Sequence, residues 1–153
     1  MSNIATSIEQ SKELVRLGLG PNTADCMWLV TSRARLHVLD GEPISNYDRW
    51  ENYPAWSLTA LLEVMPITIT KDGMEYKLGV FPSGLFSTHS DTSKWTLQYC
   101  GRDYSYKSRN KYPILAAITQ HDIIIAAYEM VCCLLEQGLI KKGGNDDSDV
   151  HNN

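Results

Sequence analysis

The stretch of this chain that most constrains its fold is a hairpin sequence at residues 67–80. Two segments with alternating apolar and polar residues flank Asp72-Gly73, a dipeptide that favours a two-residue β-turn. Such a turn imposes the following pairs: Lys71 with Met74, Ile69 with Tyr76, and Ile67 with Leu78. The isoleucines then share one face with Tyr76 and Leu78, so turn geometry and hydrophobic pattern specify the same register. One buried and one solvated face are typical of an antiparallel sheet.

A short helix with sequence signals at both ends precedes the hairpin. The hydroxyl of Ser57 can accept a hydrogen bond from a free backbone N–H at the helix start. Pro66 ends the helix, because the residue before a proline is disfavoured in the helical conformation. The apolar positions between them follow helical spacing: Leu58, Leu61, Leu62 and Met65. A single apolar stripe predicts a helix that packs on a core rather than one that binds a ligand.

Another helix is predicted at residues 7–17. Thr6 and Glu9 fit a capping box, in which a hydroxyl at the cap and a carboxylate three residues later bond to free backbone N–H groups. Gly18 marks its end, as glycine often does at helix C-termini. The face expected to meet the core carries four residues: Ile4, Ile8, Ser11 and Val15.

The most apolar helix is predicted near the C-terminus. Asp122 is a good N-cap, residues 123–135 are apolar on almost every side, and Gly138 ends the helix. A helix this apolar is buried on most of its sides. It either forms the spine of the core or presents a second apolar face through which the protein forms a homo-oligomer.

Further strands are predicted from alternation and from β-forming residues. Two of them, residues 26–31 and 34–39, flank Ser32-Arg33, and a third covers residues 95–100. Residues 114–119 fit either a short strand or the approach to the last helix. Residues 41–53 are polar and rich in turn-forming and aromatic residues, so an irregular conformation is expected there.

These elements predict an α+β fold, an antiparallel β-sheet of about four to five strands with about three helices packed on one face. At 153 residues, 43% of them hydrophobic, the chain can bury the core of one domain. We expect a single globular domain over residues 1–140. Residues 141–153, rich in glycine and aspartate, are expected to form a flexible polar tail.

Charge and hydropathy argue against two classes of protein: dedicated nucleic-acid binders and membrane-spanning proteins. The net charge of −4 is unlike that of dedicated nucleic-acid binders, whose affinity depends on excess lysine and arginine. No run of about eighteen apolar residues is present, which argues against a membrane-spanning helix. The N-terminus lacks the basic start and apolar run of a signal peptide, so a cytoplasmic protein is expected.

The residues that could carry chemistry show no recognised catalytic or metal-binding spacing. The chain has four cysteines: Cys26, Cys100, Cys132 and Cys133. They include no C-x-x-C pair, so reduced thiols are expected rather than disulfides or a zinc site. His89, Asp91 and Cys100 could meet only in three dimensions, which leaves an unrecognised enzyme as an alternative. We expect no catalytic residue, no metal and, without a glycine-rich phosphate-binding loop, no cofactor.

The segment from Lys94 to Tyr112 is the first candidate binding site. Five lysines and arginines against one aspartate give it a net charge of +4, which leaves −8 for the rest of the chain. Its candidate contact residues are Lys94, Arg102, Tyr104, Tyr106, Lys107, Arg109 and Lys111. Cations that hold phosphates and rings that stack on bases are typical of single-stranded nucleic-acid binding. The same pattern fits a solvated charged face or a surface for an acidic protein partner.

The aromatic loop at residues 47–53 is the second candidate. Trp50 and Tyr53 are its candidate contact residues, since tryptophan, tyrosine and arginine are enriched at protein-binding hot spots. The same loop also fits a lid over the edge of the core.

Three blocks of the chain carry a resemblance to known sequences: Ser7–Asp25, Pro54–Leu62 and Tyr128–Gly138. In this order they resemble a group of small uncharacterised proteins encoded by phages and prophages of gut anaerobic bacteria. That group often has tryptophan at the position of Cys133, where this chain departs from it. The resemblance implies a phage origin and an α+β domain. It implies no catalytic residues, because the matching positions are caps, a turn and apolar helix faces.

Together these observations predict a small non-enzymatic accessory protein of phage type that acts through protein–protein interaction in the bacterial host cytoplasm. Modulation of a host or phage factor, such as host defence, is one role of this kind. Two alternatives stay open: a single-stranded nucleic-acid-binding module that uses residues 94–112, and an unrecognised enzyme.

Overall fold

The structure is a computed structural model and describes residues 3–83, 93–101 and 113–143. Within them lie three α-helices: α1 (Ile8–Arg16), α2 (Leu58–Val64) and α3 (Ile123–Glu136). One antiparallel sheet has the order β2 (Ala34–Val38), β1 (Cys26–Val30), β3 (Glu51–Ala55). A second has the order β4 (Thr68–Lys71), β5 (Met74–Pro82), β6 (Trp95–Gly101), β7 (Ile114–Gln120). The predicted α+β fold is confirmed, with the strands divided between two sheets where the sequence suggested one.

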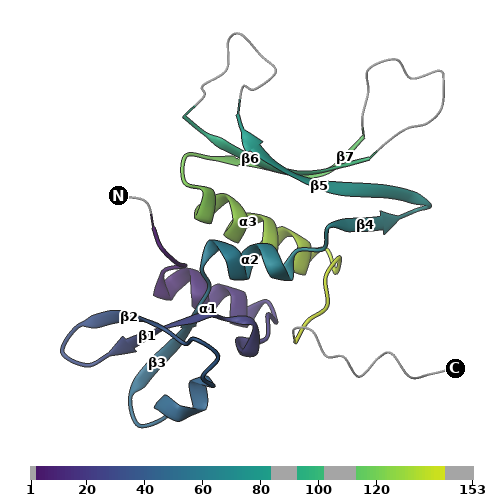
Figure 1. Cartoon of the computed structure of the whole chain (residues 1–153). Coiled ribbons are helices and arrows are strands. Elements are labelled where there is room, and N and C mark those ends of the chain that lie inside the picture. Colours follow the sequence, from purple (N-terminus) through teal and green to yellow (C-terminus); the bar gives the residue numbers. More distant parts are fainter. Residues whose placement is uncertain (1–2, 84–92, 102–112, 144–153) are drawn as a thin grey trace, which may run out of the picture.

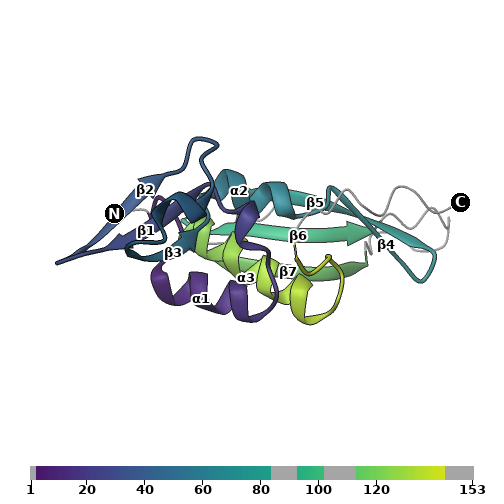
Figure 2. The same cartoon turned by 90° about the horizontal axis from the view of Figure 1, so that it is seen from below.

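The helices lie between the two sheets (Figure 1). α2 and α3 lie on one face of the four-stranded sheet, and α1 lies beyond them, in contact with α3 and β3. Figure 2 shows α3 running along the four-stranded sheet, with the three-stranded sheet at one end of the molecule. The helices therefore connect two sheets that do not pair with each other.

One large core joins the helices to the four-stranded sheet. Its fully buried side chains include Leu14, Trp56, Leu61, Leu97, Tyr99, Met130 and Leu134. The hydroxyl of Tyr99 donates a hydrogen bond of 2.6 Å to the carbonyl oxygen of Pro66, so this buried phenol has the partner that burial requires.

Helix α3 is the spine of that core. It contributes seven buried residues and none of the large apolar side chains that are exposed in the described parts of the chain. Self-association through α3 stays a prediction. No helix among the described residues has the length and apolar content needed to cross a membrane.

The hairpin forms in the predicted register: Lys71 pairs with Met74, and Ile69 pairs with Tyr76. Asp72 and Gly73 turn with φ of 54° and 78°, the left-handed conformation that a type I′ turn needs at both central residues. The carbonyl oxygen of Ile67 accepts from the N–H of Leu78 at 2.9 Å. Ile67, which precedes the first residue of β4, is nevertheless 80% exposed, whereas Ile69 is 5% exposed. The predicted burial of Ile67 on this face was therefore wrong.

The predicted caps of α2 and α3 are confirmed. Ser57 accepts from the N–H of Ala60 at 3.3 Å, and Asp122 accepts from the N–H of Ile124 at 2.8 Å. Gly138 follows α3 with a φ of 67°, so its left-handed conformation ends the helix. Residues 114–119, which fitted either a strand or the approach to α3, belong to β7.

The predicted cap of α1 was wrong by one residue. Ser7 is the cap, and Gln10 completes the capping box with hydrogen bonds of 3.1 and 2.9 Å. Thr6 is fully buried, and its Oγ1 lies 2.8 Å from Oγ of Ser11. The same Oγ1 also accepts from the backbone N–H of Trp56 at 3.0 Å. These bonds occupy the hydroxyl that the sequence assigned to the cap, so Glu9 takes no part in a capping box.

The predicted core face of α1 was also wrong. Ser11 and Leu14 are its buried residues, whereas Ile4 and Val15 are 74% and 40% exposed. The bond between Ser11 and Thr6 fixes which side of the helix faces inward. Leu14 rather than Val15 consequently enters the core.

Strand β3 lies in a stretch that the sequence predicted to be irregular. It contains Asn52 and Pro54, residue types that are depleted in strands. Proline is tolerated on an edge strand because one side of that strand donates no ladder hydrogen bonds. β3 is such an edge, and its pairing with β1 depends on contacts that the local sequence does not reveal.

The structure describes residues 141–143 of the predicted tail. These residues lie against the turn that follows α1, where the N–H of Gly143 donates to the carbonyl oxygen of Gly18 at 2.7 Å. A Cβ atom on Gly20 would lie 2.4 Å from the carbonyl oxygen of Gly143. Glycine at position 20 therefore permits this close approach of two backbone segments.

Candidate interaction surface

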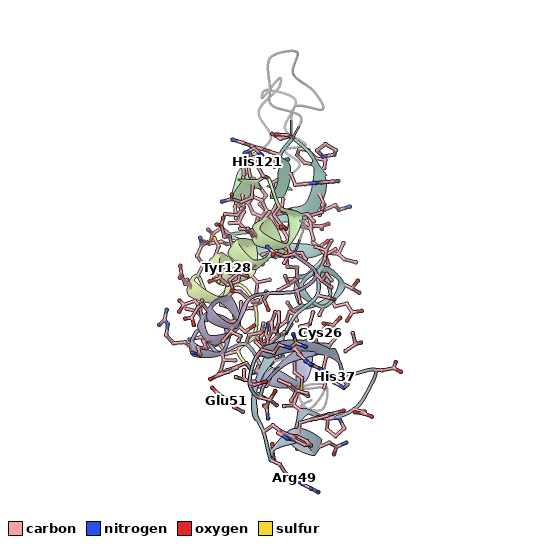
Figure 3. All side chains as sticks on the ribbon, turned by 90° about the vertical axis from the view of Figure 1, so that its left-hand side faces the viewer. Cys26, His37, Arg49, Glu51, His121 and Tyr128 are labelled. Atoms are coloured by element: carbon pink, nitrogen blue, oxygen red, sulfur yellow. The ribbon has the colours of Figure 1, made fainter. Side chains whose placement is uncertain are left out.

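Three aromatic side chains gather beside the three-stranded sheet. His37 lies on β2, Tyr47 ends a short 3₁₀ helix (Ile44–Tyr47), and Trp50 lies in the loop before β3. Ring centroids are 5.1 Å apart for His37 and Tyr47 and 6.2 Å apart for Tyr47 and Trp50, distances at which aromatic rings attract. We call these three residues the aromatic surface. Figure 3 shows His37 at the end of the molecule away from His121.

The loop that carries Trp50 is fixed by Asn52. The Asn52 side-chain amide donates to the carbonyl oxygens of Tyr47 at 2.9 Å and of Trp50 at 3.0 Å. The N–H of Trp50 donates to the carbonyl oxygen of Tyr47 at 3.1 Å. Trp50 is nevertheless 47% exposed. The chain therefore holds a large ring at its surface on a backbone that is already ordered, which lowers the entropy cost of binding.

Tyr47 links the aromatic surface to a carboxylate. Its hydroxyl donates to Oε2 of Glu42 and lies 2.9 Å from Nε2 of His37. The hydrogen bond to Glu42 raises the pKa of the Tyr47 phenol, and partial burial acts in the same direction. The Tyr47 phenol therefore keeps its proton at neutral pH and acts as a hydrogen-bond donor to Glu42.

Tyr53 lies on the opposite face of the three-stranded sheet from His37. It pairs with Trp28, whereas His37 pairs with the neighbouring residue Met27, and successive residues of a strand point to opposite faces. Nζ of Lys12, on α1, lies 5.0 Å from the centroid of the Tyr53 ring. The structure thus separates Trp50 and Tyr53, which the sequence had placed in one candidate site.

The thiols lack the environment of catalytic nucleophiles. All four cysteines are free. Burial raises the pKa of Cys26 from its ordinary value of 9.0 to about 11, and the neighbouring Asp25 carboxylate adds to this effect. Burial likewise raises the pKa of Cys132 to about 11 and that of Cys133. Reactive cysteines need a lowered pKa, so these three thiols are suited to packing rather than to attack.

The raised pKa of Cys26 predicts a loss of stability in alkaline solution. The folded protein holds this proton more tightly than the unfolded chain, so the contribution is fully present below pH 9 and is lost as the pH rises through about 11. The loss is on the order of 2 kcal/mol. Urea unfolding followed between these two pH values should show this loss. Cys26→Ala should make the decline shallower, and Cys132, whose pKa is raised similarly, should account for part of what remains. An identical decline in the variant would assign the loss to other groups.

Only the first residue of the basic candidate segment is described. Lys94 lies directly before β6, half-buried, and its carbonyl oxygen accepts from the N–H of Ser83 at 2.8 Å. The other candidate contact residues lie outside the described residues: Arg102, Tyr104, Tyr106, Lys107, Arg109 and Lys111. The nucleic-acid hypothesis therefore stays a prediction.

The enzyme hypothesis depended on Cys100 meeting His89 and Asp91. Cys100 is half-buried on β6, and its Sγ lies 3.6 Å from the carbonyl oxygen of Gly101. It lines a cavity of about 600 Å³ beside the Asp72-Gly73 turn, and the described lining contains no histidine. His89 and Asp91 lie outside the described residues. Among the described residues, no three His, Cys, Asp or Glu side chains are grouped closely enough to hold a metal ion.

Comparison with protein-family models, with curated proteins and with solved structures finds no match for this chain. The function must therefore be argued from the geometry of the site itself.

The sequence points to Trp50 but not to the residues that position it. Tyr47 entered only as the boundary of the aromatic loop, and His37 was not among the candidate contact residues. Alternation along β2 would have placed His37 on the face opposite Leu36. No local signal marks Asn52, because its role depends on two carbonyl groups that a bent loop brings within its reach.

Proposed function

We propose that this protein is a non-enzymatic interaction module that binds another protein through the aromatic surface. Trp50 carries the proposal, because it is 47% exposed on a loop held by three hydrogen bonds. Tryptophan and tyrosine dominate binding hot spots because they bury a large area with few rotatable bonds. Tyr47 and His37 extend the contact area beside Trp50.

The resemblance to phage and prophage proteins supports a setting for this interaction. In that setting the protein acts in the cytoplasm of an anaerobic bacterial host and binds a host or phage factor, with a component of host defence as one such factor. The proposed chemistry is recognition alone. The polar chain from His37 through Tyr47 to Glu42 then serves to orient the rings.

Replacement of Trp50 by alanine tests the proposal. We expect Trp50→Ala to weaken binding of the partner by at least about thirtyfold, which corresponds to a hot-spot loss of about 2 kcal/mol. Wild-type and variant proteins would each be immobilised and exposed to lysate of an infected gut anaerobe. Quantitative mass spectrometry would then compare the captured proteins, and titration with the purified partner would give the affinity.

Ile67→Ala is the matched control, because it removes another exposed apolar side chain outside the three-stranded sheet. It should leave capture unchanged, and circular dichroism should show that both variants are folded. A partner that is captured equally by Trp50→Ala and by the wild-type protein would overturn the proposal.

A further inference from the structure

A groove of about 830 Å³ lies next to the aromatic surface. Three segments form it: the 3₁₀ helix Pro21–Thr23 with the two residues after it, the connection from the end of β2 to Ile44, and the last turn of α2. Its described lining contains four carboxylates, those of Asp25, Asp40, Glu42 and Glu63, and no lysine, arginine or histidine.

These carboxylates are not neutralised by the described part of the chain. The ion pairs found there join Lys12 to Glu9, Arg16 to Glu13, and Lys77 to Glu75, and none of them involves the groove. Asp40 and Glu63 are exposed. The last turn of α2 adds negative character, because carbonyl groups at a helix C-terminus carry partial negative charge.

Apolar side chains line the same groove. Val38 is 63% exposed there, and Ile44 and Val64 are half-buried in the lining. A groove that combines accessible apolar side chains with carboxylates that have no cationic partner among the described residues is suited to a polypeptide that carries both apolar and basic residues. Nucleic acid does not suit it, because its phosphates would meet the four carboxylates.

The carboxylates are also spread along the groove. Among the described residues no three potential metal ligands lie close enough to share one ion, so this spacing fits several separate positive charges on one extended ligand. The groove is continuous with the aromatic surface, because Glu42 lines it and accepts the hydrogen bond from Tyr47.

We infer that the groove receives a basic, partly apolar segment of the partner protein, with lysine or arginine side chains paired with Asp40 and Glu63 and an apolar side chain against Val38. This inference rests on the proposed function and adds the chemistry of the partner to it. Electrostatic complementarity of this kind contributes to specificity and to the rate of association.

A peptide titration tests the inference directly. The probe is a fluorescein-labelled peptide, Arg-Leu-Arg-Ser-Leu-Arg-Ser-Arg, and its counterpart has glutamate in place of every arginine. Fluorescence anisotropy should show that the full-length protein binds the basic peptide, with affinity that falls as sodium chloride rises, and does not bind the acidic one. Asp40→Asn combined with Glu63→Gln should raise the Kd about tenfold.

Glu9→Gln combined with Glu136→Gln is the control, because it removes the same charge from exposed residues outside the groove. It should change the Kd by less than about twofold. Equal weakening by both double variants would show attraction to net charge alone and would overturn the inference. Binding of the acidic peptide, or affinity that does not change with salt, would overturn it as well.

Partner capture separates this inference from the proposed function. If Trp50→Ala abolishes capture while the Asp40→Asn, Glu63→Gln variant captures normally, the groove inference fails and the proposed function stands. If Trp50→Ala captures normally, the proposed function fails, whatever the peptide shows. Loss of capture in both variants, with normal circular dichroism, supports both.

Discussion

Replacing Trp56 by alanine should lower the free energy of unfolding by about 4 kcal/mol, the range measured when a large buried aromatic residue is truncated. Trp56 is fully buried at the junction between β3 and α2. Its Nε1 donates to Oγ1 of Thr23 at 2.9 Å, and its backbone N–H donates to Oγ1 of Thr6 at 3.0 Å. The truncation removes the ring from the large core and leaves a cavity between the segments that meet there.

Urea unfolding monitored by circular dichroism would measure this loss as a lower transition midpoint. Trp50→Ala is the matched control, because it removes the same side chain from a position that is 47% exposed, and it should cost less than about 1 kcal/mol. Trp56→Phe keeps most of the apolar surface but loses the bond to Thr23, so about 1–2 kcal/mol is expected. Similar midpoints for Trp56→Ala and Trp50→Ala would contradict the assignment of Trp56 to the core.

The second large effect is expected at Asp25, which holds the cap of α2 in place. Its Oδ1 accepts from the N–H of Ser57 at 2.9 Å and its Oδ2 accepts from the Ser57 hydroxyl. That hydroxyl in turn accepts from the N–H of Ala60 at 3.3 Å. Asp25→Ala removes a charged acceptor from two donors, so the free energy of unfolding should fall by about 2–3 kcal/mol.

Thermal and urea unfolding would both report the Asp25 effect. Asp48→Ala is a suitable control, because Asp48 is exposed and its removal should change stability by less than about 0.5 kcal/mol. Ser57→Ala should cost about 1 kcal/mol through loss of the cap. In combination with Asp25→Ala it should cost less than the two single effects added, because the two residues form one network. Full additivity would argue against that network.

The parts of the fold that the sequence predicts are those whose signals are local. The hairpin at Asp72-Gly73, the cap at Ser57 and the limits of α3 each depend on residues within a few positions of one another. Their physical cause is short-range: turn dihedral angles, a free N–H group, and a helical apolar pattern. The structure confirms all three.

The parts that the sequence misses depend on distant partners. Pro54 argues against a strand in the local sequence. The segment forms strand β3 because it pairs with β1 at the edge of the sheet, where a proline is tolerated. Thr6 has the local pattern of a cap, but its hydroxyl accepts a hydrogen bond from the backbone N–H of the distant Trp56. The division into two sheets depends on which strands pair with one another. Alternation within each strand carries no information about its pairing partner.

The candidate surface shows the same limit. Composition alone selects Trp50, because an aromatic loop rich in charged residues is typical of contact surfaces. Composition also selects Tyr53, but Tyr53 lies on the opposite face of the three-stranded sheet from His37, because successive residues of a strand alternate between faces. The acidic groove has no signature in sequence, because its carboxylates come from three separate segments between Asp25 and Glu63.

The position of α1 has a consequence for the order in which the chain acquires structure during synthesis. Leu14 of α1 belongs to the same buried cluster as Leu134 of α3, and Asn3 donates to the carboxylate of Asp122. During synthesis α1 leaves the ribosome first and α3 last, so the buried cluster that contains Leu14 cannot be completed until α3 has been made. Such long-range closure slows folding and leaves apolar surface open during translation. We expect the nascent protein to depend on chaperones until α3 has emerged.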